Sequence, residues 1–536
     1  MKRFYRDNFQ YILLAVIIIL MLYALRRQYI MDDAFISFRY SKNLIEGNGL
    51  VWNIGERVEG YSNFLWTMLV AGWMLIGVKP ETSTLWMGMI FHLAGLIMTY
   101  LMASRLLKSR DWGLLVMILV GTNYTVSSMA SSGLETPLQL LLFLLAGHLF
   151  VLGVENGWTN RRTLMLSVVL NIAMLTRPDS VILVAAAVIG YYYTKKDRHY
   201  TDFIRLAIPF ALIFLPYLIW KTGYYGSLFP NSYHAKVRGL SGVLYGLFYI
   251  YLFSISYFLL PYFFMVIWRG KSLYRDYPVI GYLALFVSVW IIYVIGVGGD
   301  FMDFRFMIAV TPFIFIVILE VLKRYISDNR LRTALIIVLL LGTFHHTFAF
   351  KRIILGYGVE KVNELADHLV RPDQNWNAVG KRLNELFGGT DVVLGVGPAG
   401  AIPYYCNTTC IDLIGLTDAE IPKIAESFSV VPGHRIISPL DYLYHRGVNL
   451  VIQPVSLMIP TQEFPMWVGY ARWSNIHHFF LDVDNPGKGR RIDEAILLGI
   501  PINDDYILIT WYMTPSETVE RVIREQNLRR IRLVRR

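Results

Sequence analysis

The apolar positions of this chain gather into long runs that are separated by short polar loops. A helix that crosses a bilayer needs about 20 consecutive apolar residues, and most of the runs approach that length. We therefore expect about eleven transmembrane helices. They cover residues 9–25, 84–104, 112–128, 137–154, 164–176, 180–194, 204–221, 243–267, 278–297, 306–322 and 333–350.

A twelfth apolar run, residues 62–78, decides on which side of the membrane each loop lies. If it crossed the membrane, the basic loop 105–110 would lie opposite the basic N-terminus, against the tendency of Lys and Arg to stay on the cytoplasmic side. If the run lies along the interface or re-enters, the basic loops all face the cytoplasm. We adopt the second arrangement, which makes residues 26–83 the first outer loop.

This arrangement gathers the polar, non-repetitive loops on the outer face. A site built from several loops is therefore expected there. The segments are Asp32–Asp33, EGYSN (59–63), SGLETP (132–137), TRPD (176–179), GYYGSLFPNSYHAKVRG (223–239) and GGDFMDFRF (298–306).

Beyond about residue 351 the hydropathy falls, and runs of strand length alternate with helical patterns. Residues 392–394, 450–453 and 506–510 are typical of strands, and residues 361–370 and 376–387 of helices. We expect a transmembrane domain, residues 1–350, and a soluble α/β domain, residues 351–536, which an odd number of spans places outside the cytoplasm. The basic stretch 519–536 predicts an amphipathic helix, with either a solvated face or a contact with anionic lipid.

Composition agrees with a polytopic membrane protein. The chain is 55% hydrophobic and only 17% charged, whereas an ordinary globular domain is about 25% charged. The net charge is +11, and the Lys and Arg residues lie mainly in short loops and in the C-terminal tail. We therefore interpret most of them as signals of membrane topology and predict no nucleic-acid partner. The two cysteines, Cys406 and Cys410, fit a disulfide or two free thiols equally well.

The acidic pair is the first candidate for chemistry, because carboxylates beside a bilayer are costly. Asp32 could be the N-cap of a helix over residues 34–45, with Asp33 near its positive end. Either carboxylate could take a proton from an acceptor hydroxyl. The pair could also hold a divalent cation, although no further carboxylates cluster beside it, so metal dependence is open.

Further candidates follow in the outer loops. Tyr61, between Glu59 and Asn63, suits hydrogen bonding to a sugar as well as an interfacial aromatic belt. His234 and Lys236 could clamp a phosphate or be solvated, and Arg305 could bind phosphate, snorkel, or pair with Asp300 or Asp303. Arg177 and Asp179 are expected to pair with each other. The full set of candidate binding residues is Arg39, Glu59, Tyr61, Asn63, Asn231, His234, Lys236, Asp300 and Arg305.

Gly395, Gly397 and Gly400 have the spacing G-x-G-x-x-G of a dinucleotide site. Pro398 lies inside this segment, and the next strand-like run begins about ten residues later, which leaves little room for the crossover helix of a βαβ unit. We interpret these glycines as a tight turn.

The ordered series of motifs resembles a known family. DDAFISFRYSKNLIEGNGLVWNIGERVEGYSNFLW, SGLETPL, TRPD, YYGSLFPNSYHAKV, GGDFMDFRF, GPAGAIPYY and IDLIGLTD are similar to the terminal β-(1→2) arabinofuranosyltransferases of mycobacteria and their bacterial relatives. These proteins fall within the GT-C superfamily of membrane glycosyltransferases, which use polyprenyl-phosphate sugars. The resemblance covers most of the chain, including the C-terminal domain.

The resemblance implies a multi-pass protein of the bacterial plasma membrane that moves a sugar, arabinofuranose-like, from a polyprenyl-phosphate donor to an envelope glycan or glycolipid. It implies that Asp32 and Asp33 are the catalytic motif. An inverting reaction would use one Asp as a general base, whereas retention would not. The alternatives are an envelope or flagellar assembly factor, or a transporter, for which internal repeats would be expected.

Overall fold

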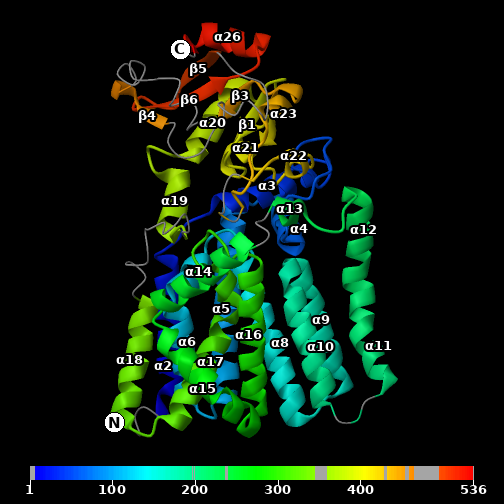
Figure 1. Cartoon of the computed structure of the whole chain (residues 1–536), viewed down its shortest axis with the longest axis vertical. Helices are drawn as coiled ribbons and strands as arrows, with labels where there is room; N and C mark the ends of the chain where they lie inside the picture. Colours follow the sequence, from blue (N-terminus) through cyan, green and yellow to red (C-terminus); the bar gives the residue numbers. More distant parts are fainter. Residues whose placement is uncertain are drawn as a thin grey trace.

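A bundle of long helices forms one end of the molecule, and a sheet domain forms the other (Figure 1). The computed structural model describes residues 7–195, 197, 199–235, 240–344, 359–427, 431, 433–452, 458–463 and 494–534. The bundle helices are α2 (Phe9–Leu25), α5 (Pro80–Leu106), α6 (Arg110–Thr122), α7 (Tyr124–Met129), α8 (Thr136–Asn156), α9 (Asn160–Thr176), η1 (Pro178–Ser180), α10 (Val181–Thr194), α11 (Tyr200–Pro209), η2 (Phe210–Phe214), α12 (Leu215–Tyr225), α14 (Leu240–Ser256), α15 (Leu260–Asp276), α16 (Pro278–Gly296), η3 (Arg305–Val310), α17 (Thr311–Tyr325) and α18 (Asn329–Phe344).

Each of the eleven predicted spans coincides with helix in the described residues. Five of these helical stretches are long and apolar enough to cross a bilayer, namely α5, α8, the continuous run from α11 to α12, α16, and η3 with α17. The number rises to six if α14 and α15 together form one span. The count of about eleven stays a prediction.

The segment 243–267 differs from the single straight span that its hydropathy predicts. The structure has two helices here, α14 and α15, bent by 106° at the break between them. The α14 helix ends at Ser256, and Phe258 in the break has a φ of +55°, a conformation that interrupts a right-handed helix. The segment is therefore a broken span or a re-entrant hairpin.

The apolar run 62–78 contains only the 12-residue helix α4 (Phe64–Leu75). At 1.5 Å per residue, such a helix is about 18 Å long, which is short of the roughly 30 Å hydrocarbon core. This length supports the arrangement in which the run does not cross.

The end of the bundle next to the sheet domain carries short helices that connect the two. They are α3 (Asp32–Ile45), α13 (Asn231–Ala235), α19 (Val362–Val370) and α20 (Trp376–Phe387). The first helix, α2, begins at the end of the bundle opposite the sheet domain (Figure 1). Such a placement agrees with an odd number of crossings.

In the described part of the sheet domain, seven strands form one sheet in the order β2-β1-β3-β6-β5-β7, with β4 paired to β6. Strand β1 pairs in parallel with β2 and β3, and the other neighbouring strands pair antiparallel. The predicted strands 392–394, 450–453 and 506–510 are found as β1, β3 and β6, with residue 453 outside the described residues, and both predicted helices are found as α19 and α20. The elements are β1 (Val393–Val396), α21 (Ala401–Cys406), β2 (Thr409–Asp412), α22 (Ile421–Ile424), α23 (Leu440–His445), β3 (Leu450–Ile452), β4 (Met458–Pro460), η4 (Thr461–Glu463), β5 (Glu494–Pro501), β6 (Tyr506–Tyr512), α26 (Glu517–Glu525) and β7 (Arg529–Val534).

Two details of this domain differ from the sequence-based interpretation. The glycine segment is followed by a crossover helix after all, because the six residues of α21 fit between the parallel strands β1 and β2. The basic C-terminal stretch is not one amphipathic helix: α26 ends at Glu525, and residues 529–534 form an edge strand of the sheet. In the structure, α26 lies at the end of the molecule opposite the bundle (Figure 1). It therefore does not reach a bilayer that the bundle would span, which argues against the lipid contact.

The segment 26–83, predicted as the first outer loop, contributes to the core of the sheet domain as well as to the core of the bundle. Ile36, Tyr40, Trp52 and Tyr61 are buried in one cluster with strand residues such as Leu394. The opposite face of α3 packs into the core of the bundle. The helix that carries the acidic pair is thus held from both sides.

Candidate functional site

The acidic pair begins α3. Met31 is the N-cap, in extended conformation and without a side-chain cap, so Asp32 is the first helical residue and not the expected N-cap. Both carboxylates lie in the first turn, where the partial positive charge of the helix favours anions. The two side chains nevertheless meet different surroundings.

Asp32 binds the glycine segment of the sheet domain. Its Oδ1 accepts a hydrogen bond from the amide of Ala401 at 2.8 Å, and its Oδ2 accepts one from Gly400 at 3.1 Å. These amides open α21. The approach is so close that a Cβ on Gly400 would lie 2.0 Å from the carbonyl oxygen of Asp32, so glycine is required there.

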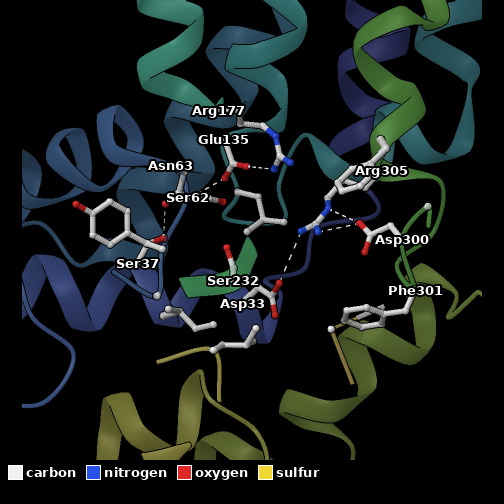
Figure 2. A pocket seen from close by; sticks show the side chains of 18 residues that line it. Asp33, Ser37, Ser62, Asn63, Glu135, Arg177, Ser232, Asp300, Phe301 and Arg305 are labelled. Atoms are coloured by element: carbon white, nitrogen blue, oxygen red, sulfur yellow. Dashed lines mark hydrogen bonds and ion pairs between the residues drawn. The ribbon is translucent and has the colours of Figure 1, made fainter. Parts of the chain in front are cut away.

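Asp33 lines a polar cavity of about 130 Å³, which we call the polar compartment. Its carboxylate Oδ2 lies 3.7 Å from Nη1 of Arg305, and 36% of the side chain's surface is exposed. Figure 2 shows Asp33 and Arg305 directed toward each other from α3 and η3. A substrate in the compartment can reach this carboxylate.

Two arginines supply positive charge to the polar compartment. Arg305 donates from Nε to Asp300 at 2.8 Å, and Arg177 pairs with Glu135 and Asp179 at 2.7 Å each. The predicted pairing of Arg177 with Asp179 is confirmed. Both arginines are mostly buried yet line the cavity (Figure 2), and arginine is well suited to recognise phosphate oxygens.

Hydrogen bonds fix the wall opposite Arg305. Asn63 donates to Glu135 at 2.8 Å and accepts from the Ser37 hydroxyl at 3.0 Å. Because Ser37 is one turn beyond Asp33 on α3, this chain of bonds sets the orientation of the helix face that carries Asp33.

Burial raises the pKa of both carboxyl groups. The pKa of Asp33 rises to about 6 because protein replaces water around it; Arg305 opposes this rise, and Asp300 and Glu135 add to it. The pKa of Asp32 rises to about 7, chiefly through burial, against the stabilising amides of Ala401 and Gly400. Asp33 is therefore ionised above about pH 6 and can act as a base or nucleophile at neutral pH.

A second cavity, of about 310 Å³, adjoins the polar compartment, with which it shares Asp33, Ile36, Phe301, Leu416 and Gly433. It lies between the start of α3 and the sheet domain, and we call it the interface compartment. Trp376, His368 and Glu360 contribute to its wall.

The structure brings some of the predicted binding residues together. Tyr61, Asn63, Asp300 and Arg305 all line the polar compartment. The Tyr61 hydroxyl also lies 3.2 Å from that of Tyr225.

Three other candidates do not line the polar compartment and make contacts within the chain; their role in binding stays a prediction. Arg39 is buried and donates to the carbonyls of Trp52 and Thr408, so it ties α3 to the sheet domain. Glu59 forms an ion pair with Lys221 at 2.6 Å. Asn231 donates to the carbonyls of Gly415 and Asp418, 2.8 and 2.7 Å away.

The phosphate clamp predicted for His234 and Lys236 lies outside what the structure describes, since Lys236 and the His234 side chain are not among the described groups. Glu135 and Arg177 line the polar compartment but were not among the predicted binding residues. Their signal was present in the motifs SGLETP and TRPD, which both lie on the predicted outer face.

Other candidate chemistry can be located as well. In the part of the chain that the structure describes, no three His, Cys, Asp or Glu side chains are grouped closely enough to hold a metal ion. Cys406 and Cys410 are buried and unbridged, with their sulfur atoms 3.5 Å apart.

Comparison with known proteins gives partial sequence matches. A domain of unknown function (DUF8728) matches residues 364–509. The terminal β-(1→2)-arabinofuranosyltransferase of Mycobacterium tuberculosis is 32% identical over 228 residues, which are 39% of this chain and 35% of that protein. The enzyme of the same name from Corynebacterium glutamicum is 26% identical over 362 residues, 59% of this chain and 51% of that protein. The matches thus span about a third and a half of these relatives.

Solved structures share the fold over nearly the whole chain. ArnT from Cupriavidus metallidurans bound to undecaprenyl phosphate has a TM-score of 0.55 at 9% identity, covering 94% of this chain and 98% of ArnT. The Archaeoglobus fulgidus oligosaccharyltransferase in complex with zinc and sulfate has a TM-score of 0.50 at 10% identity, covering 93% and 73%. The chain therefore shares the fold of ArnT and of the oligosaccharyltransferase, and it resembles terminal arabinofuranosyltransferases over part of its sequence.

Proposed function

We propose that this protein is a membrane glycosyltransferase that moves a sugar from a polyprenyl-phosphate donor to a hydroxyl of an envelope glycan or glycolipid. The observation that carries the proposal is the accessible Asp33 carboxylate, 3.7 Å from Arg305, in a polar cavity at one end of the helix bundle. The partial similarity to arabinofuranosyltransferases favours an arabinofuranose-like pentose as the sugar.

The donor phosphate would lie against Arg305 and Arg177. Both guanidinium groups line the polar compartment, and each is balanced by carboxylates, so a phosphate would extend existing ion-pair networks. The compartment adjoins the ends of apolar helices, so a lipid tail could stay in the bilayer while the sugar reaches Asp33. ArnT, which shares the fold, was crystallised with undecaprenyl phosphate.

Asp33 can serve the transfer in one of two ways. As a general base it takes the proton of the acceptor hydroxyl while that oxygen attacks the anomeric carbon, and the configuration inverts. As a nucleophile it forms a glycosyl ester that the acceptor then displaces, and the configuration is retained. The anomeric configuration of the product, determined by NMR, distinguishes them.

The orientation that we propose places the sheet domain outside the cytoplasm of a bacterium, with the helices in the plasma membrane. A lipid-linked donor suits that side because it needs no cytoplasmic nucleotide sugar. Asp32 is proposed to position α3 through its contacts with Gly400 and Ala401.

The two aspartates form a matched pair for the test. Membranes containing the protein are supplied with polyprenyl-phosphate [14C]arabinofuranose and an arabinofuranose oligosaccharide, with and without EDTA to test the open question of a cation. Asp33→Asn should lower the transfer rate by about 10²- to 10⁴-fold, as expected for loss of a catalytic base.

Asp32→Asn should be milder, because the amide side chain keeps one oxygen that can accept a backbone hydrogen bond. Full transfer by Asp33→Asn at normal expression would overturn the catalytic assignment. Absence of transfer by the unsubstituted protein with this donor, and with other polyprenyl-phosphate sugars, would favour an assembly factor or transporter.

A further inference from the structure

Asp33 stands at the boundary of two compartments that differ in charge. Within the described lining, the polar compartment has Arg177 and Arg305, whereas the interface compartment has neither Lys nor Arg. Two histidines line it: His368 uses both ring nitrogens, 2.5 Å from Glu360 and 2.6 Å from Gln374, and the His434 ring packs edge-on against Phe301 with centroids 4.7 Å apart. A phosphate has suitable partners on one side of Asp33, and a neutral ligand is better matched to the other.

The position of the interface compartment argues against a lipid tail as its occupant. Its described walls come from α3, from Phe301 and Met302 in the loop before η3, and from the sheet domain with the helices α19 and α20 that precede it. None of these described residues belongs to a candidate membrane-spanning helix. A polyprenyl chain would have to leave the bilayer to enter this space, at a cost proportional to the apolar area exposed on the way.

The lining combines an aromatic ring with polar groups. Trp376 faces the cavity, and its ring is stacked on His368 with centroids 4.6 Å apart and planes 2° apart. The contacts of His368 with Glu360 and Gln374 hold this pair in place. A rigid aromatic surface beside a few carboxylates is typical of sites for small polar ligands with an apolar face, a description that fits a sugar ring.

The size of the cavities agrees with this division. The interface compartment, at about 310 Å³, is at the lower end of the range of about 300–1,000 Å³ for ligand pockets. The polar compartment, at about 130 Å³, has room for a smaller group.

We propose that the interface compartment is the acceptor subsite, in which a neutral sugar residue of the acceptor glycan rests against Trp376 and directs one hydroxyl toward Asp33. The inference rests on the proposed glycosyltransferase function. In the net transfer, the acceptor oxygen forms a bond to the anomeric carbon and the bond from that carbon to the phosphate oxygen breaks. The hydroxyl proton leaves through Asp33 or to the departing phosphate, and polyprenyl phosphate is released.

The test separates acceptor from donor kinetics. Trp376→Ala should raise the KM for an arabinofuranose oligosaccharide by about tenfold, the upper effect of one aromatic contact, and leave the KM for the polyprenyl-phosphate sugar within about twofold. Trp376→Phe should restore most of the acceptor affinity because it keeps an aromatic surface. Arg305→Gln should show the opposite pattern, with the donor KM raised. Thermal unfolding of each variant checks that it is folded.

A second readout does not depend on catalysis. Binding of the oligosaccharide to the Asp33→Asn protein is measured by calorimetry. Adding Trp376→Ala to this protein should weaken oligosaccharide binding by about tenfold, the factor expected for the acceptor KM. Equal acceptor binding with and without Trp376 would overturn the inference. It would also be overturned if Trp376→Ala weakened the binding of undecaprenyl phosphate and left acceptor binding unchanged, a result that would assign the compartment to the lipid. A failure of transfer by the unsubstituted protein would instead count against the proposed function, while the binding comparison still decides the subsite.

Discussion

Neighbouring residues in this chain have separate tasks. The Asp32 carboxylate accepts hydrogen bonds from two backbone amides of the sheet domain. The Asp33 carboxylate faces the polar compartment beside Arg305. In a helix, successive side chains point about 100° apart, so one acidic pair can serve both docking and chemistry.

The ionisation of Asp33 predicts the acid limb of the pH profile. Asp33 must be ionised to act as a general base or as a nucleophile. Burial raises its pKa to about 6 against the opposing charge of Arg305, so kcat/KM should fall as the pH drops below about 6. Arg305 lowers this pKa, hence Arg305→Gln should move the acid limb to higher pH, whereas Arg305→Lys keeps the charge and should leave it nearly in place.

The measurement is kcat/KM from pH 5 to 8 at subsaturating donor, which reports the free enzyme. The position of the limb is compared, not the rate, because Arg305 is also proposed to bind phosphate. An unchanged limb in Arg305→Gln would show that another group controls it.

At the scale of elements, the glycine segment fixes the start of α3. A Cβ on Gly400 would collide with the backbone of Asp32, 2.0 Å from its carbonyl oxygen. Gly400→Ala should therefore force α3 and α21 apart, destabilise the folded protein by about 1–3 kcal/mol, and reduce transfer. The effect is measured as a lower Tm in detergent together with activity.

The matched control is Gly270→Ala in α15, where nothing lies within 4 Å of the added Cβ. This change should leave Tm the same or slightly higher, since Ala is the better helix former. A Gly400→Ala protein as stable and active as the control would show that the contact with Asp32 is dispensable.

For the whole molecule, the orientation in the membrane is the main prediction. Ser327 is exposed in the loop between α17 and α18, which we place in the cytoplasm, and Asp504 is exposed between β5 and β6, which we place outside. In intact cells, or in spheroplasts if an outer envelope blocks access, an impermeant thiol reagent should label Asp504→Cys and not Ser327→Cys.

The unsubstituted chain is the background control, because Cys406 and Cys410 are buried and should react little. Permeabilised cells should label both variants. Labelling of Ser327→Cys in intact cells, with Asp504→Cys protected, would invert the proposed topology.

Local pattern determined much of this protein from the sequence alone. Long apolar runs located the helices, and short apolar runs located β1, β3 and β6. Both follow because a helix in a bilayer and a strand in a sheet core must present apolar side chains to their surroundings. Loop polarity also placed Asp33, Asn63, Asp300 and Arg305 on one face, and these residues do line one cavity.

Only the tertiary structure decided which polar residue does what. Arg39 and Asn231 are of residue types that often bind ligands, but their side chains donate to the carbonyls of Thr408 and Asp418, which are 369 and 187 positions away in the chain. Asp32 and Asp33 are indistinguishable by type and position until Gly400 and Arg305 are brought beside them. Periodicity records whether a side chain is buried, whereas its partner depends on how distant segments pack, which no local pattern contains.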